Sequence, residues 1–353
     1  MLIAIFNARL IMNLFLPSKA VLDVAHKRLF TSFSSLSLSK KINAGFRKDV
    51  DMIKYRTLVM ITLIITGISL AAATPAVAKI VTDQLERQVD VPDDPQRVVA
   101  LAPSITEIVF ALQRQDRLKG VTTYSDFPPE AAKLPKVGSY VHLDLERIVA
   151  LKPDLCIAIK DGNPRAVAQR LDSLKIPVYA VDPKNLETVM QTVLQIGKLL
   201  NAEQKANLLV QNMRSRVRRI ESLVSKITHR PRVFFQIGIS PIVSVGTDTF
   251  MHELVVLAGG INLAQGPVAY PRFSREQILA LAPEVFIITS MARMAVFEQV
   301  KAEWSRWPNL PAVRNNRMFL EDSNLFDRPT PRLVDGLELL VRLIHPELFK
   351  EAK

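Results

Sequence analysis

Short runs of apolar, often β-branched residues alternate with stretches of helical periodicity along most of the chain beyond residue 79. The short runs read as buried strands, and the longer periodic stretches between them read as helices. Strands that alternate with helices favour a largely parallel sheet covered by helices. The pattern therefore predicts an α/β fold, with strands expected at residues 97–101, 155–159, 178–181, 232–237, 285–289 and 318–320.

The first helix of this fold is expected directly after the first strand. Ser104 is a good N-cap residue, and Glu107 follows it at the spacing of a capping box. The pattern predicts a helix that Ser104 caps and that runs through Leu112.

Two segments of the chain, residues 143–154 and residues 273–284, repeat one pattern without a gap. Each has an N-cap residue (Asp144 or Ser274), then the Ile/Leu stripe of a short helix, then proline and an acidic residue before an expected strand. Internal repetition of this kind indicates that one structural unit is used twice. We therefore expect two lobes of similar construction.

A helical segment separates the two repeats. Residues 185–230 are expected to connect an N-terminal lobe (79–184) to a C-terminal lobe (231–353), both Rossmann-like with mainly parallel sheets. One helix over residues 203–228 would be about 39 Å long at the α-helical rise, which predicts a rigid connection and small lobe motion. Its apolar stripe consists of Met213, Val217, Ile220, Val224 and Ile227. Its arginines are expected on a solvated outer face: Arg214, Arg216, Arg218 and Arg219.

The sequence before residue 79 has the features of a secretory signal peptide. Two basic residues precede an apolar run over residues 58–73, and Ala76-Val77-Ala78 gives the small-x-small pattern of a signal peptidase site. We expect a signal peptide over residues 52–78, with cleavage after Ala78. Residues 1–51 read as a doubtful leader or a mis-assigned start. The alternative for the apolar run is a membrane anchor, because its length is near the lower limit for spanning.

Composition narrows the function classes. The 353 residues carry a formal net charge of +12, but residues 1–78 hold ten Lys/Arg against three Asp/Glu, so most of the excess precedes the expected mature chain. No block of Lys and Arg alternates with aromatic residues, which argues against nucleic-acid binding. The lone cysteine, Cys156, cannot form an internal disulfide or a cysteine-based zinc site, and it reads as a buried strand residue.

Motifs for catalysis are not visible in the sequence. It contains no nucleophile elbow, no P-loop and no His-Glu-x-x-His, and Gly259-Gly260 reads as a helix C-cap. The histidines beyond residue 79 show no metal-cluster spacing. We therefore expect a binding protein with no catalytic residues and no metal site, rather than an enzyme.

The signal peptide, the duplicated lobes and the connecting helix together resemble the helical-backbone (class III) substrate-binding proteins of ABC importers. Several strings are similar to the cobalamin-binding members in particular, namely residues 124–129, 146–155, 232–239 and 274–277. The resemblance implies a periplasmic protein that binds a cobalamin-type corrinoid in the cleft between its lobes. It also implies a monomer that delivers this ligand to the membrane permease subunits of an ABC importer.

A corrinoid is a broad disc fringed with amides, so its site needs flat aromatic faces and a few hydrogen-bonding groups. By resemblance, Tyr124 lies against the ligand, Phe127 follows on the same loop, and Tyr140 and Tyr270 take the place of cleft tryptophans. A C-terminal loop is expected to contact the edge of the ligand, with Arg328 offering a fork of donors and Asp327 orienting it or accepting amide protons. This loop consists of Asn324, Leu325, Phe326, Asp327 and Arg328.

Glu146 and Glu276 occupy the same place in the two repeats. The resemblance implies that these glutamates meet arginines of the transporter subunits, one from each lobe. The alternative is that both simply favour the dipole at the start of a helix.

The sequence departs from the cobalamin-binding pattern at three points. Ile159 and Ile237 stand where large aromatic residues are expected, the chain cannot form the disulfide expected there, and His142 lies next to Tyr140, within reach of a metal. These departures leave a ferric-siderophore or haem-binding protein of the same class open. A membrane-tethered sensor or scaffold domain is the alternative of another class.

Overall fold

The computed structural model describes residue 57, residues 60–61, residues 78–290 and residues 294–349. The expected signal peptide and the segment before it lie outside the described residues, apart from a few positions. Among the described residues, no helix is both long and apolar enough to cross a membrane. The fold begins with a two-stranded antiparallel sheet of β1 (Ala78–Thr82) and β2 (Gln88–Pro92).

The first lobe is built on a parallel sheet of four strands in the order β4-β3-β5-β6. Strand β5 is entirely apolar and entirely buried, as expected for a central strand covered on both faces. The burial raises the pKa of the Cys156 thiol within it to about 12, so the cysteine is an inert core residue. The strands are β3 (Val98–Ala100), β4 (Leu118–Val121), β5 (Leu155–Ile159) and β6 (Val178–Val181).

Alternate residues of these strands enter two different cores. Val98 and Ile157 face a core that includes the helix after β3 and the connecting helices, whereas Val99 and Cys156 face a smaller core on the other side of the sheet. This period of two is the ordinary consequence of the strand pleat. The helices of the first lobe are α4 (Pro103–Ala111), α5 (Leu145–Ala150) and α6 (Arg165–Ser173).

The second lobe is built on a mixed sheet with the order β10-β8-β7-β11-β12, and β9 pairs with β7. Strand β11 runs parallel to β7 and β12, whereas β8 is antiparallel to β7 and β10. The strands are β7 (Arg232–Gly238), β8 (Ile242–Ser244), β9 (Ile261–Asn262), β10 (Arg272–Phe273), β11 (Val285–Ser290) and β12 (Met318–Asp322). The helices are α9 (Phe250–Leu257), α10 (Arg275–Leu281), α11 (Met294–Trp304), α12 (Pro311–Arg314), α13 (Ser323–Phe326) and α14 (Leu333–Ile344).

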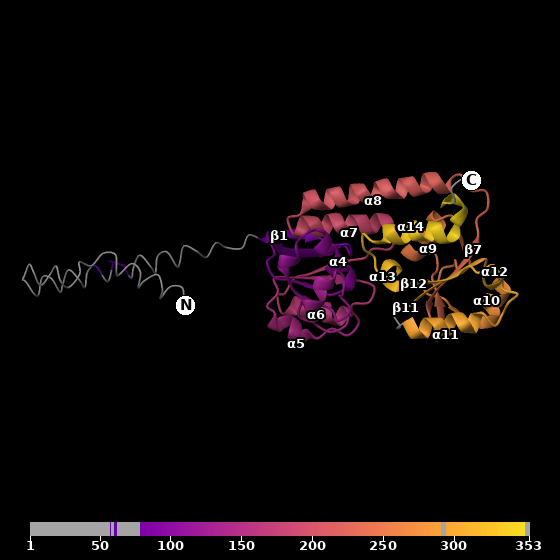
Figure 1. The fold of residues 1–353 in the computed structure, drawn as a ribbon. Helices are drawn as coiled ribbons and strands as arrows, with labels where there is room; N and C mark the ends of the chain where they lie inside the picture. Colours follow the sequence, from indigo (N-terminus) through magenta and orange to yellow (C-terminus); the bar gives the residue numbers. More distant parts are fainter. Residues whose placement is uncertain (1–56, 58–59, 62–77, 291–293, 350–353) are drawn as a thin grey trace, which may run out of the picture. The chain divides into compact units, whose positions relative to one another are not determined.

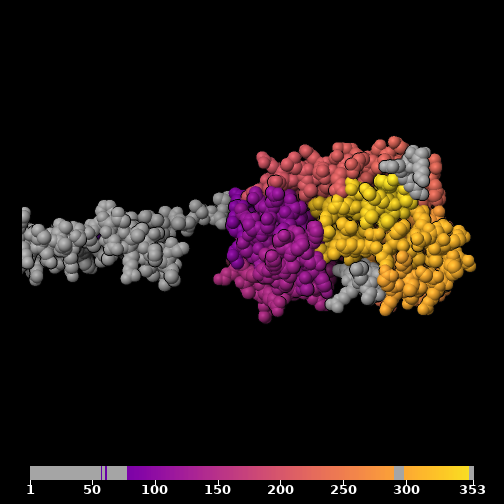
Figure 2. Space-filling view, viewed as in Figure 1, coloured from indigo at the N-terminus to yellow at the C-terminus, as the bar shows by residue number. Residues whose placement is uncertain are grey.

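Two antiparallel helices, rather than one, form the connection between the lobes. The first, α7 (Leu186–Leu199), begins with a capping box between Asn185 and Thr188, and the second, α8 (Glu203–Val224), runs along both lobes (Figures 1 and 2). The expected end of this helix at residue 228 is wrong by four residues, which leaves a helix about 33 Å long.

The arginines of α8 were expected to be solvated, but three of them form ion pairs. Arg216 contacts both Glu338 (2.8 Å) and Asp335 (2.5 Å) of α14, and Arg219 joins it at Glu338 (3.0 Å). Arg214 pairs with Glu187 of α7 (2.8 Å). The polar face of α8 therefore forms ion pairs with α7 and α14 in addition to facing water.

The α/β class, the two lobes and the mainly parallel strands are confirmed. All six expected strands are present, and those at 155–159 and 178–181 have the expected bounds. Both repeat helices have the expected caps, because Asp144 accepts from Arg147 N and Ser274 forms a capping box with Gln277. The lobe boundaries stay predictions.

The expected cap of the first helix is wrong. Helix α4 starts at Pro103 with Ala102 as N-cap and no side-chain cap, and both Ser104 and Glu107 are buried. Pro103 favours the first helical position because it needs no hydrogen-bond acceptor there. Glu107 is therefore free to serve another role, described below.

Candidate functional site

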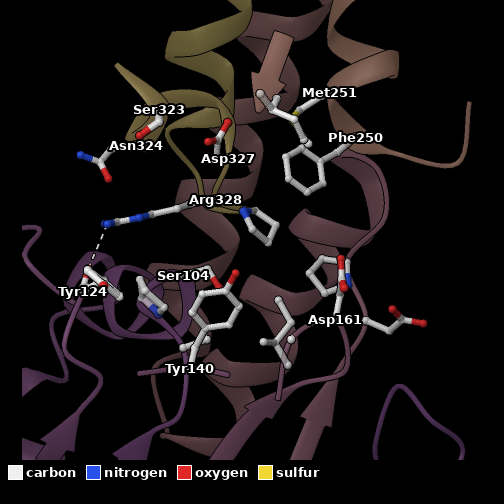
Figure 3. A pocket seen from close by; sticks show the side chains of 18 of the residues that line it. Ser104, Tyr124, Tyr140, Asp161, Phe250, Met251, Ser323, Asn324, Asp327 and Arg328 are labelled. Carbon is white, nitrogen blue, oxygen red and sulfur yellow. Dashed lines mark hydrogen bonds between the residues drawn. The ribbon is translucent and has the colours of Figure 1, made fainter. Parts of the chain in front are cut away.

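A cavity of about 510 Å³ lies where the two lobes face each other. In the first lobe its walls come from the segments that follow β3, β4, β5 and β6. In the second lobe they come from Ile237 of β7, the start of α9, the loop before β10 and the segment after β12. The carboxyl ends of parallel strands meet at such an edge, which is where α/β proteins bind ligands. The lining residues include Ser104, Tyr124, Tyr140, Ile159, Asp161, Gly162, Asp182, Ile237, Phe250, Met251, Tyr270, Ser323, Asn324, Asp327 and Arg328 (Figure 3).

Two tyrosines face the cavity from opposite lobes. Tyr140 comes from the first lobe and is partly buried, and Tyr270 comes from the second lobe and is 40% exposed. The Tyr270 hydroxyl donates a hydrogen bond to Asp161 Oδ2 of the first lobe (3.1 Å). Burial, followed by the charge of Asp161, raises the pKa of both phenols, so both remain neutral hydrogen-bonding groups at ordinary pH.

Asp327 is the acidic side chain that the second lobe contributes to the described cavity lining. Burial raises the pKa of its carboxyl to about 7, although a hydrogen bond from Thr289 Oγ1 (3.2 Å) and the charge of Arg328 act in the opposite direction. Near neutral pH this side chain therefore exists in both protonation states. It can accept a hydrogen bond from an amide N–H when ionised, or donate one to an amide oxygen when protonated.

Arg328 is at the cavity, but groups of the first lobe occupy its donors. Its Nη1 donates to Glu107 Oε1 (2.8 Å) and Asp126 Oδ1 (3.0 Å). Its Nη2 donates to the carbonyl of Tyr124 (2.9 Å), the bond drawn in Figure 3. Arg332 binds the same buried Glu107 through two further hydrogen bonds of 2.9 and 3.0 Å. Two arginines of the second lobe thus share one buried carboxylate of the first.

Four of the expected ligand-contacting residues lie outside the lining, namely Phe127, His142, Leu325 and Phe326. Phe326 is fully buried and packs edge-on against Phe235, with ring centroids 5.7 Å apart, and its apolar side chain fills the core below the loop. Leu325 is partly buried against the same core. The Phe127 ring lies under the guanidinium of Arg332, 3.6 Å from its Cζ, so it supports the bridge between the lobes.

Phe326 and Leu325 therefore pack in the core and Phe127 supports Arg332, so these side chains do not line the cavity in the structure. His142 is exposed and is also outside the lining, although it follows Tyr140 closely in sequence. Contact of these four residues with a ligand stays a prediction. Tyr124, Tyr140, Tyr270, Asn324, Asp327 and Arg328 do lie together at the cavity.

The two glutamates expected to dock the transporter are both exposed. Glu146 lies in the first turn of α5 and Glu276 in the first turn of α10, directly after the capped starts of the two repeat helices. The Ser274 side chain and the backbone N–H of Glu276 lower the pKa of Glu276, so it is a carboxylate at ordinary pH. Their role at a transporter stays a prediction.

Sequence reasoning did not assign several lining residues. Asp161 and Gly162 follow β5, and Asp182 follows β6. Their position directly after a predicted parallel strand could have indicated a place in the binding site. Phe250 and Met251 start α9 and gave no signal of their own, because apolar residues at a helix start read as core. Among the described residues, no group of three or more His, Cys, Asp or Glu is placed to hold a metal ion.

A cavity between two α/β lobes, with a helical connection along one side, defines a two-lobed binding protein. The sequence matches the periplasmic binding protein family over residues 98–325, which is more than half of the chain. The protein therefore belongs to the periplasmic binding protein family.

Individual relatives narrow the comparison. The vitamin B12-binding protein of Vibrio parahaemolyticus is 33% identical over 244 residues, covering 69% of this chain and 86% of that protein. The periplasmic vitamin B12 binding protein BtuF of Vibrio cholerae has a similar structure, with a TM-score of 0.64 and 29% identity over 74% of this chain and all of that one. A periplasmic heme binding protein from Pseudomonas aeruginosa is similar too, with a TM-score of 0.67 and 28% identity over 73% of this chain and 94% of that one.

Proposed function

We propose that this protein is a periplasmic substrate-binding protein that binds a cobalamin-type corrinoid and delivers it to the permease subunits of an ABC importer. The observation that carries the proposal is the cavity between the lobes, where three tyrosines and Asp327 face one space. Tyrosine rings supply flat faces for a disc, and hydroxyl groups together with a carboxyl that exists in both protonation states suit the amides at its edge. The relatives named for vitamin B12 support the same ligand.

The charges of the described lining residues favour a corrinoid over haem or a ferric siderophore. Three carboxyl side chains line the cavity, those of Asp161, Asp182 and Asp327, against one arginine. That arginine, Arg328, is held by Glu107 and Asp126. These carboxylates would repel an anionic ligand, such as haem with its propionates. They would not repel the neutral amides of a corrinoid.

Haem also needs an axial ligand. The raised pKa values of Tyr140 and Tyr270 oppose the phenolate form that would bind iron, and His142 lies away from the cavity lining. Haem or a siderophore is therefore the second candidate of the same class. It rests on the similarity to the heme binding protein and on the presence of the two tyrosines.

The proposal extends to the location and the partners of the protein. We propose export by the signal peptide at residues 52–78, action as a monomer, and docking through Glu146 and Glu276, one exposed carboxylate from each lobe. It assigns the protein no catalytic activity. N-terminal sequencing of exported protein tests the leader: a start at Lys79 supports export, and an uncleaved leader supports the membrane-tethered sensor or scaffold alternative.

Calorimetric titration of the protein from Lys79 with cyanocobalamin tests the ligand. We expect one-to-one binding in the micromolar range or tighter, together with a shift of the corrinoid visible bands. Haemin and a ferric siderophore serve as competing probes. Binding of either one in place of cyanocobalamin would replace the corrinoid with that ligand and keep the class.

A further inference from the structure

The segment Asp161-Gly162-Asn163 follows β5 at the edge of the cavity, and each of its residues contacts a cavity tyrosine. Asp161 and Gly162 line the cavity themselves. Asp161 is exposed and Gly162 and Asn163 are partly buried, so the segment does not belong to the core. Its contacts with Tyr140 and Tyr270 suggest that it sets the positions of the two rings.

Gly162 provides the surface against which the Tyr140 ring lies. A Cβ atom at this position would be 2.3 Å from Tyr140 Cε2 and 2.6 Å from Cδ2, closer than any carbon contact allows. Its φ angle of 112° is in the region that favours glycine. Any side chain here would therefore force the Tyr140 ring out of its observed position or shift the backbone.

Asn163 fixes the backbone of Tyr140. Its Nδ2 donates to the Tyr140 carbonyl (2.7 Å) and to the Leu101 carbonyl (2.8 Å), and its Oδ1 accepts from Ile159 N (2.8 Å). Leu101 follows β3, and Ile159 is the last residue of β5. One amide side chain therefore ties the Tyr140 loop to the ends of two neighbouring strands.

Asp161 fixes the other tyrosine, across the cleft. It accepts the hydrogen bond of the Tyr270 hydroxyl from the second lobe, at 3.1 Å. This bond restrains the free end of a ring that is otherwise 40% exposed. Through Asp161 and Gly162, two adjacent residues thus determine where the rings of both lobes stand.

We propose that Asp161, Gly162 and Asn163 are positioning residues that set the spacing and the plane of Tyr140 and Tyr270, and thereby select a flat ligand. The proposal rests on the proposed function, because it assumes that a disc binds against these rings. It goes further by assigning the selection to three residues of one turn.

The first test is a double-mutant cycle between Gly162 and Tyr140. We expect G162A to weaken cyanocobalamin binding about three- to tenfold, the contribution of one well-placed aromatic contact. In a Y140A background the same G162A change should weaken binding clearly less, because the ring that it displaces is gone and only the backbone strain at this φ remains. Equal losses in both backgrounds would mean that Gly162 acts only through backbone strain and would overturn its positioning role.

Gly266→Ala is the matched control, since nothing lies within 4 Å of a Cβ at Gly266. This variant should bind like the wild type. Urea unfolding of every variant separates a loss of folded protein from a loss of affinity. If G162A does not fold, N163A in the wild-type and Y140A backgrounds replaces it, with the same expected pattern.

The second test is a cycle between Asp161 and Tyr270. D161A and Y270F each remove the hydrogen bond across the cleft, so each should weaken cyanocobalamin binding by a similar factor, and the double variant by no more than either alone. An increase in affinity on D161A would show that the bond has to break for the ligand to enter, which contradicts the proposal.

A measurement without ligand separates this proposal from the proposed function. The ring signals of Tyr140 and Tyr270 can be followed by NMR with labelled tyrosine and assigned with Y140F and Y270F. G162A should shift the Tyr140 signal and D161A the Tyr270 signal; unchanged signals would overturn the positioning role. If the wild type binds no cyanocobalamin while the signals shift as expected, the corrinoid assignment fails and the positioning of the rings stands.

Discussion

At the scale of single residues, Asp327 shows how burial controls the chemistry of the cavity. Its pKa is raised to about 7 mainly by burial, so the folded protein holds a proton that the unfolded chain releases above its ordinary pKa of 3.8. A carboxyl with a raised pKa lowers stability as pH rises through the interval between those two values, and the cost is complete above the higher one.

Asp327→Asn removes this titration and keeps the shape of the side chain. We expect the gain in unfolding free energy of the variant over the wild type to be about 1–2 kcal/mol larger at pH 8 than at pH 5, after allowance for solvent at the cavity. Urea unfolding at both pH values measures it. D90N, at an exposed position of β2, is the control. A gain that does not change with pH would contradict the assigned burial effect.

Sequence reasoning at this scale succeeded for residues whose place depends on a loop and failed for those whose place depends on packing. Tyr140, Tyr270 and Asp327 lie at the cavity as expected. Phe326 lies next to Asp327 in the sequence, but the short helix α13 turns it into the core against Phe235. A string of residues cannot show which of two neighbours faces inward when a helix of one turn decides it.

At the scale of elements, the close approach of α7 and α8 depends on one glycine. A Cβ at Gly197 would be 2.5 Å from the Cβ of Ala206, so the two helices pack here backbone against backbone. Buried apolar residues of both helices belong to the same core. Glycine inside a helix is usually unfavourable, which indicates that helix packing requires it.

Gly197→Ala tests this packing. Helix propensity alone would make the variant more stable, but we expect a loss of about 1–3 kcal/mol from overpacking. The double variant G197A/A206G should recover part of this loss, because it restores the space from the other helix. Thermal or urea unfolding of both variants decides the matter, and a stabilised G197A would contradict the packing argument.

The periodic pattern of apolar residues predicted most helices and strands correctly, because the helices and strands of this fold are buried on regular faces. The apolar run of β5 and the caps of Asp144 and Ser274 are local signals, and local signals were enough. The first helix was mispredicted because Ser104 and Glu107 have partners that come from elsewhere. Glu107 binds Arg328 and Arg332, more than two hundred residues away, and no local rule shows such a pair.

At the scale of the whole molecule, the ion pairs of Glu107 with Arg328 and Arg332 join the two lobes on the side of the cavity. The connecting helices hold the lobes along one side (Figure 1), and Glu107 with its two arginines holds them at a second place. The carboxylate side chain is 3% exposed, and those of Arg328 and Arg332 are 11% and 19% exposed. Two restraints of this kind leave less freedom for lobe motion than the helices alone.

Glu107→Gln tests the bridge with little change of shape. Removing one partner of a buried ion pair leaves uncompensated charge, so we expect a loss of about 3–5 kcal/mol, reduced to the extent that water reaches the two arginines. D116N, at an exposed position of the first lobe, should change little. Urea unfolding measures the loss.

Small-angle scattering should show a wider range of lobe separations in E107Q than in the wild type. Because Arg328 also lies at the cavity and keeps only Asp126 as its acidic partner, E107Q should make the cavity more positive, and binding of anionic haemin should increase relative to cyanocobalamin. An unchanged preference between the two ligands would show that the neutralisation of Arg328 by Glu107 does not control selectivity.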